Sequence, residues 1–141
     1  MQVKMNWKEN MHFQGSAESG HVVSLDVPAA EGETSKGFTP MQMIAMGVAG
    51  CTSMDVINIL AKRRLNVKDF NVQVEVDRRD EIPRVFTHLH FIYTVTGKNI
   101  QRKDVEFAVK LSEEKYCQGI AMMRASGASI SNEIVIKESE M

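Results

Sequence analysis

Apolar and polar residues alternate along the first part of the chain, up to Val27. The apolar positions are Val3, Met5, Trp7, Met11, Phe13, Val23, Leu25 and Val27. A period of two is typical of half-buried strands, and turn-forming residues interrupt it at residues 9–10 and 15–20. The pattern predicts an antiparallel meander of about three short strands, followed by a surface loop over residues 28–37 that is rich in small and acidic residues.

A helix-start signal follows this loop. Thr39 can cap a helix N-terminus, and Pro40 has the fixed φ that suits the first helical position. The predicted helix extends to about Arg64. Its apolar residues cover two sides: one side holds Met41, Ile44, Ala45, Val48, Thr52, Val56 and Ile59, and the other holds Met43, Met46, Gly47, Gly50, Met54, Ile57 and Ala61.

Two apolar sides on this helix have a consequence for assembly. A helix that is apolar around most of its circumference is buried on most sides. One sheet can cover one side, so a second helix or a second subunit must cover the other. Gly47 and Gly50 each cost about 1 kcal/mol relative to alanine, which suits the close approach of another backbone. We therefore expect a homodimer whose interface includes Met43, Met46, Gly47 and Gly50.

The second half of the chain predicts two strands, a helix and a closing strand. Residues 70–77 and 85–96 alternate and are joined as a hairpin by the charged turn of residues 78–84. A helix follows over residues 101–116, and its predicted buried face holds Val105, Phe107, Ala108, Val109 and Leu111. A short helical turn over 119–124 and a strand over 130–137 complete the chain. The fold class is α+β, with antiparallel strands and a long central helix.

Length and composition restrict the classes of function. A chain of 141 residues with 43% hydrophobic and 25% charged side chains suits a single domain over residues 1–141. The net charge is -1, and no long block of one sign exists to bind nucleic acid. The longest charge-free stretch, residues 37–54, is too polar for a membrane span. With no visible secretory or lipidation signal, we expect a cytoplasmic protein without a membrane partner.

Two cysteines, Cys51 and Cys117, are the candidates for chemistry. Their wide separation in sequence matches no short metal-binding spacing. Each could be a small buried hydrophobic residue or a reactive thiol. Lys115 lies beside Cys117, and a nearby cation would lower the pKa of that thiol.

The histidines and glycines point to neither a metal nor a cofactor. His88 and His90 share one face of a predicted strand, but no third close ligand accompanies them. No phosphate-binding glycine loop is present in the sequence. We therefore predict no metal site and no cofactor.

Three segments carry a resemblance to a known family. They are residues 39–64 (TPMQMIAMGVAGCTSMDVINILAKRR), 81–93 (EIPRVFTHLHFIY) and 111–117 (LSEEKYC). Together they resemble the osmotically induced and organic-hydroperoxide-resistance proteins, the OsmC/Ohr family, and most closely its OsmC-like branch. The resemblance implies an OsmC-like fold, an intertwined homodimer, and a thiol-dependent peroxidase that reduces organic hydroperoxides. It also implies that Cys51 attacks the peroxide, that Cys117 resolves the oxidised sulfur as a disulfide, and that an external dithiol restores both thiols.

The sequence departs from the family pattern at the residues that activate the thiolate. Characterised members resemble one another in a glutamate directly after the helix-opening proline and in an arginine from the N-terminal strands. Here Met41 follows Pro40, and the first 36 residues contain no arginine. Arg84, Asp55 and His88 are candidate replacements through charge or hydrogen bonding. Each also has a structural interpretation: a turn charge, a paired polar group in a helix, and a solvent-facing strand residue.

The missing pair leaves a second function open. A non-catalytic protein could use the same dimer pocket to bind a fatty acyl chain or another apolar ligand. Phe86, Phe91 and Phe107 could form an apolar wall for an organic hydroperoxide or for such a ligand, although residues of this kind are also typical of a plain core.

Overall fold

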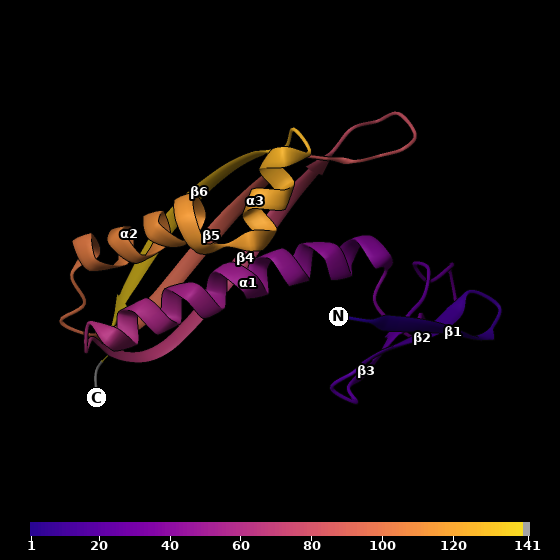
Figure 1. Cartoon of the computed structure of the whole chain (residues 1–141), viewed down its shortest axis with the longest axis horizontal. Coiled ribbons are helices and arrows are strands. Elements are labelled where there is room, and N and C mark those ends of the chain that lie inside the picture. The colour runs from indigo at the N-terminus through magenta and orange to yellow at the C-terminus, as the bar shows by residue number, and fades with distance from the viewer. Residues whose placement is uncertain (140–141) are drawn as a thin grey trace. The chain divides into compact units, whose positions relative to one another are not determined.

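The computed structural model describes residues 1–139, and the chain forms two compact units (Figure 1). One unit comprises Met1–Ile44, and the other begins at Ala45. The expectation of one domain over residues 1–141 stays a prediction.

The first unit contains the predicted meander. Its strands are β1 (Val3–Glu9), β2 (His12–Ala17) and β3 (Val22–Leu25), antiparallel and in the order β1-β2-β3. Asn10 adopts a positive φ of 48° in the β1–β2 turn, a conformation that asparagine tolerates better than most residues. The Trp7 indole closes this turn by donating to the Asn10 carbonyl at 2.8 Å.

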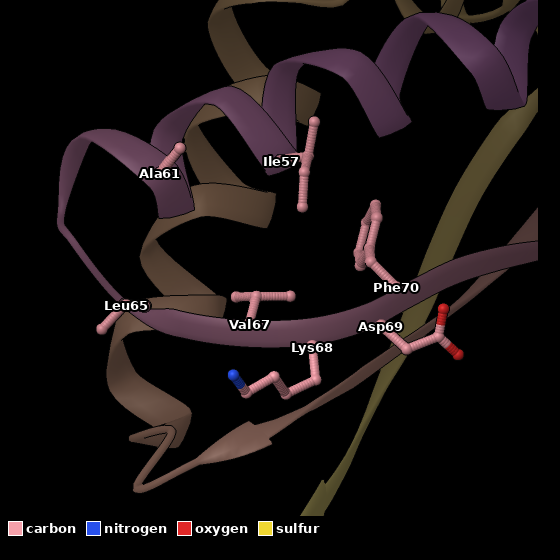
Figure 2. Close-up of a pocket in the computed structure, with 7 residues that line it drawn as sticks. All are labelled: Ile57, Ala61, Leu65, Val67, Lys68, Asp69 and Phe70. Carbon is pink, nitrogen blue, oxygen red and sulfur yellow. The ribbon is translucent and has the colours of Figure 1, made fainter. Parts of the chain in front are cut away.

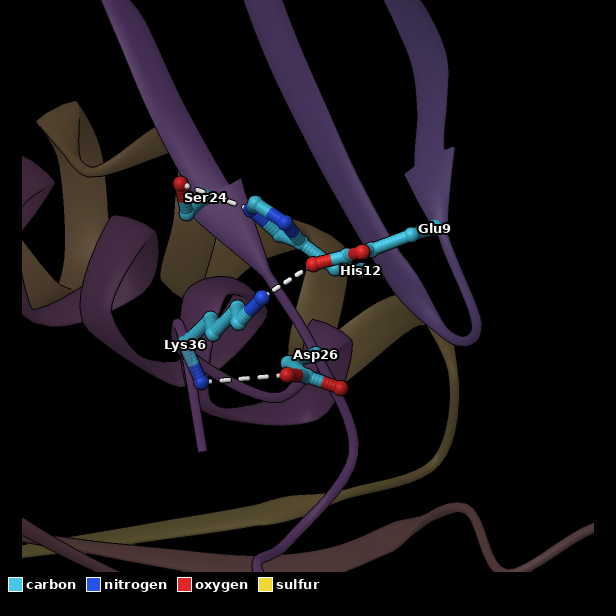
Figure 3. Close-up of polar contacts among 5 residues, drawn as sticks. All are labelled: Glu9, His12, Ser24, Asp26 and Lys36. Atoms are coloured by element: carbon cyan, nitrogen blue, oxygen red, sulfur yellow. Dashed lines mark hydrogen bonds and ion pairs between the residues drawn. The ribbon is translucent and has the colours of Figure 1, made fainter. Parts of the chain in front are cut away.

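Polar contacts within this first unit hold the loop after β3 (Figure 3). The Asp26 carboxylate accepts from the backbone N–H of Lys36 at 3.0 Å, and the Lys36 ammonium pairs with Glu9. The hydrogen bond from Lys36 lowers the pKa of Glu9, and backbone N–H donors, that of Lys36 first, lower the pKa of Asp26. Glu9 is exposed and Asp26 only half-buried, so these contacts fix the path of the loop more than they stabilise the fold.

The long helix α1 (Pro40–Lys62) begins where the sequence predicts it. Thr39 Oγ1 accepts from the Gln42 N–H at 3.2 Å, and Gln42 Oε1 accepts from the Thr39 N–H at 2.9 Å. This reciprocal pair is a capping box, which satisfies two backbone donors at the start of a helix.

The sheet of the second unit contains β4 (Asn66–Arg78), β5 (Phe86–Lys98) and β6 (Ser129–Glu138), with β5 in the centre. The β4–β5 hairpin is antiparallel, as predicted. One pairing differs from the expected antiparallel strands, because β6 runs parallel to β5. A parallel neighbour needs a crossover connection, and here α2 (Arg102–Leu111), the π-helical turn η1 (Ser112–Tyr116) and α3 (Gln118–Ala125) form it.

The helices α1, α2 and α3 lie on one face of this sheet (Figure 1), and the core lies between them. The fully buried residues include Leu60, Val56, Leu89, Phe91, Tyr93, Val95, Val105, Ala108 and Ile120. By length and hydropathy alone α1 could cross a membrane. Its stripe of buried residues, which are Ala45, Val48, Thr52, Val56 and Leu60, shows that it is a core helix.

The second apolar side of α1 is uncovered by the part of the chain that the structure describes. Met46 is 46% exposed, Met54 is 74% exposed and Ile57 is 38% exposed. Among residues 1–139, and apart from the neighbouring backbone of α1 itself, no atom lies within 4 Å of the place where a Cβ on Gly47 or Gly50 would stand. The helix therefore has one buried apolar side and one open apolar side.

Candidate functional site

Three of the four predicted site residues lie together in the second unit. The sulfur atoms of Cys51 and Cys117 and a carboxylate oxygen of Asp55 all lie within 4.8 Å of one another. Cys51 and Asp55 are four residues apart, so they share one face of α1. Cys117 approaches them from the start of α3. Both thiols are free.

The backbone around Cys117 explains how it reaches α1. The helical path after Leu111 continues as a π turn, and the Cys117 N–H donates to the Ser112 carbonyl at 2.8 Å. π turns occur often at functional sites. Cys117 then caps α3, because its sulfur accepts from the Ile120 N–H at 3.4 Å. A Cβ on Gly119 would lie 3.0 Å from Val48 Cα, so glycine lets α3 start close against α1.

The two thiols differ in their surroundings. Cys117 is only 3% exposed, and burial raises its pKa to about 12, with further contributions from Cys51 and Asp55. The sequence-based expectation of a pKa lowered by Lys115 is therefore wrong. The Lys115 ammonium instead lies over the Tyr116 ring, 5.3 Å from its centroid. Cys51 is half-buried, which makes it the more accessible of the two sulfurs.

A chain of buried hydrogen bonds leads away from Asp55. Ser112 Oγ donates to Asp55 Oδ2 at 3.0 Å, and it also lies 2.9 Å from Thr52 Oγ1. Thr52 Oγ1 lies 3.0 Å from Tyr93 Oη, which donates to Glu113 Oε2 at 2.8 Å. Thr52, Ser112 and Tyr93 are fully buried, and Glu113 is 8% exposed. Burial raises the pKa of Tyr93, so the phenol keeps its proton.

Glu113 has further partners at the far end of this chain. Its Oε1 accepts from Asn132 Nδ2 at 2.9 Å, and its backbone carbonyl accepts from the Arg124 guanidinium. These three residues help to line a groove of about 260 Å³. Glu113 therefore connects the buried chain with a groove on the surface of the unit.

Sequence reasoning missed the chain of hydroxyl groups. Ser112 and Glu113 belong to the LSEEKYC segment, yet nothing in the pattern distinguishes this buried glutamate from the exposed Glu114 beside it. One signal was available: Thr52 lies on the predicted buried side of α1, where an unpartnered hydroxyl would be costly.

The other candidate residues lie elsewhere. Arg84 Nε donates to the Arg79 carbonyl at 3.1 Å, within the β4–β5 hairpin. His88 bonds Ser129 Oγ at 2.5 Å and Ser131 Oγ at 2.7 Å. Strand alternation places His88 on the sheet face opposite Leu89 and the helices. Within one chain, the observed contacts of Arg84 and His88 are therefore structural.

A groove of about 570 Å³ lies between α1 and α2, and Asp55 is the member of the site that lines it. Its lining includes Asp55, Asn58, Ile59, Lys62, Arg63, Phe107, Leu111 and Tyr116. Phe107 is 44% exposed, which corrects the prediction that it belongs to the buried face of its helix. Arg63 covers its ring at 4.1 Å and pairs with Asp104 at 2.7 Å. The groove therefore combines aromatic surface with cations.

The expected aromatic wall is only partly present. Phe91 is fully buried and stacks on Tyr93 with 6.2 Å between ring centroids. Phe86 is 7% exposed. Both residues belong to the core. Phe91 shares the helix-facing side of β5 with Leu89 and Tyr93, whereas Phe86 lies at the start of the strand, beyond the shift in the β4–β5 register. Only Phe107 of the three predicted phenylalanines faces the groove.

A second hollow lies where α1 ends and β4 begins (Figure 2). Its volume is about 360 Å³, and its lining is mainly apolar: Ile57, Ala61, Leu65, Val67, Lys68, Asp69 and Phe70. Ile57 and Phe70 point toward one another across it (Figure 2). This hollow continues the open apolar side of α1.

The three donor atoms around Cys51 could in principle attract a soft cation. A structural zinc site needs four ligands, and cysteine binds metal as the thiolate. Cys51, Asp55 and Cys117 supply three donors, and the raised pKa of Cys117 favours its neutral thiol. The three donors therefore fall one short of a closed structural zinc site within residues 1–139.

Comparison with known proteins adds to this geometry. Residues 32–132 match the family described as OsmC-like protein. The chain belongs to this OsmC-like family. Protein YhfA of Escherichia coli is 37% identical over 132 residues, which is 94% of this chain and 95% of that protein. The match confirms the family membership that the three sequence segments predict.

Solved structures of OsmC-like proteins and others share the fold. A hypothetical protein from Aquifex aeolicus has a TM-score of 0.85 and 27% identity, over 99% of this chain and 97% of that one. The organic hydroperoxide resistance protein OhrB of Bacillus subtilis has a TM-score of 0.59 and 19% identity, over 97% and 98% of the two chains. The α+β fold class with a long central helix is therefore confirmed.

Proposed function

We propose that this OsmC-like chain is a thiol-dependent peroxidase that reduces organic hydroperoxides through Cys51 and Cys117. The observation that carries the proposal is the approach of the two free thiols, whose sulfur atoms lie within 4.8 Å of each other. A disulfide needs a sulfur separation near 2.05 Å, so the two sulfur atoms must approach further when the bond forms. OhrB, a protein of the same fold, is named as an organic hydroperoxide resistance protein, and this supports an organic hydroperoxide as the substrate class.

The surroundings of the thiols support different roles for them. Cys51 is half-buried and lies one helical turn from Asp55, which lines the larger groove, so a peroxide has a route to its sulfur. Cys117 is buried, and its raised pKa keeps it a thiol, which suits a residue that reacts only after Cys51 has become a sulfenic acid. A second thiol at this distance protects the sulfenic acid from further oxidation. An external dithiol then reduces the disulfide by exchange.

The groove beside Asp55 supports an organic substrate. Phe107 and Tyr116 give it exposed aromatic surface, since they are 44% and 50% exposed. Apolar surface of this kind binds the carbon skeleton of an organic peroxide and gains nothing from hydrogen peroxide.

Loss of thiols on reaction with a peroxide tests the proposed activity. Free thiols are titrated before and after one equivalent of cumene hydroperoxide. Rapid loss of two thiols per chain, with one disulfide between Cys51 and Cys117 found by peptide mapping, supports the peroxidase. Retention of both thiols after prolonged exposure contradicts it.

A second candidate function is the binding of an apolar ligand without catalysis. The hollow between α1 and β4 favours it, since Ile57, Val67 and Phe70 offer apolar contacts there. Met41 in place of the usual glutamate also favours it. Binding of a fluorescent fatty acid with unchanged thiol content after peroxide treatment would select this alternative.

The open side of α1 supports a homodimer as part of the proposal. Met46, Met54 and Ile57 are exposed large apolar side chains on one helix face, and such patches mark interaction sites. A second copy would bury this side, and glycine at 47 and 50 allows two backbones to approach closely. We expect the dimer to be intertwined and the protein to be cytoplasmic.

A further inference from the structure

The hydrogen bonds between Asp55 and Glu113 do not balance if both carboxyl groups are ionised. Ser112 donates to Asp55, and Tyr93 donates to Glu113. Thr52 lies between them, 2.9 Å from Ser112 Oγ and 3.0 Å from Tyr93 Oη. A hydroxyl has one proton to donate, so Thr52 can fill only one of its two contacts.

One further proton completes the chain. Two buried oxygen atoms in contact without a hydrogen between them are unfavourable, because neither is solvated. A proton on Glu113 lets every hydroxyl point toward Asp55, and a proton on Asp55 lets every hydroxyl point toward Glu113. The two arrangements differ only by one hop of each proton along an existing hydrogen bond.

We propose that Asp55, Ser112, Thr52, Tyr93 and Glu113 form a proton relay, in which Glu113 holds a proton that reaches the thiol pair through Asp55. The use of this proton by the thiols rests on the proposed peroxidase function. The sharing of one proton between the two carboxyl groups rests on the hydrogen-bond geometry alone.

The first step that the relay serves is the attack on the peroxide. The Cys51 sulfur forms a bond to one peroxide oxygen, the O–O bond breaks, and the alkoxide leaves. Sulfur is oxidised to the sulfenic acid, and the peroxide is reduced to an alcohol. Asp55 gives the alkoxide its proton, and the proton that the Cys51 thiol releases refills the chain.

The second step forms the disulfide. The Cys117 sulfur attacks the sulfenic sulfur of Cys51, the S–O bond breaks, and hydroxide leaves as water with a proton from Asp55. The Cys117 thiol then gives its own proton to the relay, so the relay holds the same number of protons before and after the step. This supply is useful because the raised pKa of Cys117 makes its thiol slow to give up a proton. The hydroxide that leaves the Cys51 sulfenic acid therefore needs a proton from another group in the buried site.

Charged groups face both ends of the relay and influence its pH response. At the thiol end the cations Lys62 and Arg63 line the groove with Asp55, next to the titratable thiols of Cys51 and Cys117. At the far end Glu106, Lys110, Glu114 and Arg124 line the groove with Glu113. Asn132 holds Glu113 Oε1 without adding charge. Thr52 directly follows Cys51 in α1, but its hydroxyl contacts only Ser112 Oγ and Tyr93 Oη, so removing that hydroxyl breaks the relay at its middle without changing a charged group.

The decisive experiment compares Thr52→Val with Thr87→Val. Valine keeps the shape of threonine and removes its hydroxyl. Thr87 is exposed and its hydroxyl donates to the Asp77 carbonyl, far from the relay, so Thr87→Val is the matched control. After one equivalent of cumene hydroperoxide, the rate of Cys51–Cys117 disulfide formation is followed from pH 5 to pH 9 by acid quench and mass spectrometry.

The expected result is a slower reaction in Thr52→Val only. At pH 7 the rate should fall at least tenfold, since positioned proton transfer contributes about 10²–10⁴-fold, and the pH profile should change shape. A rate within threefold of wild type in folded Thr52→Val overturns the relay. If Thr52→Val does not fold, Glu113→Gln replaces it, because the amide keeps a hydrogen bond to Tyr93 but holds no mobile proton.

A separate measurement distinguishes failure of the relay from failure of the peroxidase. Carboxyl-carbon NMR of the wild-type protein at pH 7 should find one proton shared by Asp55 and Glu113. Two ionised carboxylates overturn the relay even if the enzyme is active. A shared proton in a chain that forms no disulfide with peroxide supports the hydrogen-bond assignment and contradicts the peroxidase.

Discussion

Gly119 lies so close to Val48 that a Cβ at position 119 would stand 3.0 Å from the Val48 Cα atom. This contact joins the start of α3 to the buried side of α1. Val48 lies three residues before Cys51, and Gly119 lies two residues after Cys117. The position of one thiol relative to the other therefore depends on the absence of a side chain at position 119.

Substitution of this glycine should separate the thiols. Gly119→Ala forces the start of α3 away from α1, and we expect a loss of about 1–3 kcal/mol in the free energy of unfolding. Disulfide formation between Cys51 and Cys117 after peroxide addition should slow as well. Denaturant unfolding and quenched-flow mass spectrometry measure the two effects. Unchanged values for both would show that Val48 gives way without moving Cys117.

The fold could be predicted from the sequence because its signals are local. Thr39 and Pro40 mark the start of α1, and strand alternation locates β4 and β5. The direction of β6 could not be predicted from alternation, since a period of two is the same in parallel and antiparallel strands. It follows from the crossover through α2 and α3.

The candidate site was predictable only in part. Cys51 and Cys117 were found through a family resemblance, and Asp55 through its place one turn beyond Cys51. Their approach depends on the π turn after Leu111, which no sequence pattern indicates. Glu113 was missed because its burial results from Tyr93 and Asn132, which lie on two different strands.

The two cysteines should respond differently to substitution. Cys51→Ser should abolish peroxide consumption, because it removes the attacking sulfur. Cys117→Ser should permit a single oxidation and then leave Cys51 as a sulfenic acid or a more oxidised form. A sulfenic-acid probe with mass spectrometry distinguishes these states. Equal peroxide consumption by Cys51→Ser and wild type would refute the assignment.

The raised pKa of Cys117 predicts a loss of stability at high pH. In the unfolded chain this thiol ionises near its ordinary value of 9.0, whereas in the folded chain it ionises near 12. Folding thus requires a neutral thiol, and its contribution is complete below pH 9 and declines as pH rises toward 12. The slope approaches about 1.4 kcal/mol per pH unit.

Cys117→Ala provides the comparison for this effect. It lacks the ionisable group, so its free energy of unfolding should fall less steeply between pH 9 and 11 than that of the wild type. Urea unfolding at several pH values under reducing conditions gives both curves. Parallel curves would contradict a buried neutral thiol at position 117.

The open side of α1 predicts an obligate homodimer. Light scattering at micromolar concentration should give about twice the chain mass of 15.8 kDa. Gly47→Ala should weaken the dimer, because an added methyl group separates two closely packed backbones. In a monomer the same change would stabilise the helix by up to about 1 kcal/mol. A compact monomer, or a more stable Gly47→Ala protein, would therefore count against the interface at Met43, Met46, Gly47 and Gly50.

The last prediction concerns the cation that a reactive Cys51 requires. A cysteine attacks a peroxide as its thiolate, and a nearby positive charge favours that form, so a peroxidase needs a cation close to the attacking sulfur. Arg84 is our candidate because a guanidinium stays charged when partly buried and donates several hydrogen bonds. Within its own chain, Arg84 Nε donates to the Arg79 carbonyl in the hairpin. We therefore expect Arg84 to act on Cys51 of the partner subunit in the dimer.

Alkylation of Cys51 by iodoacetamide tests this role directly. Arg84→Met should need a higher pH for the same rate of alkylation, by roughly one unit or more if one close charge dominates. Arg79→Met is the matched control, since Arg79 donates to the Glu81 and Ile82 carbonyls in the same hairpin and its loss reports any change in hairpin structure. A shift in Arg84→Met alone assigns Arg84 to the thiol. An unchanged profile in a folded dimer makes Arg84 a turn residue and strengthens the case for a binding protein, because the thiol pair would then lack the charge that its chemistry demands.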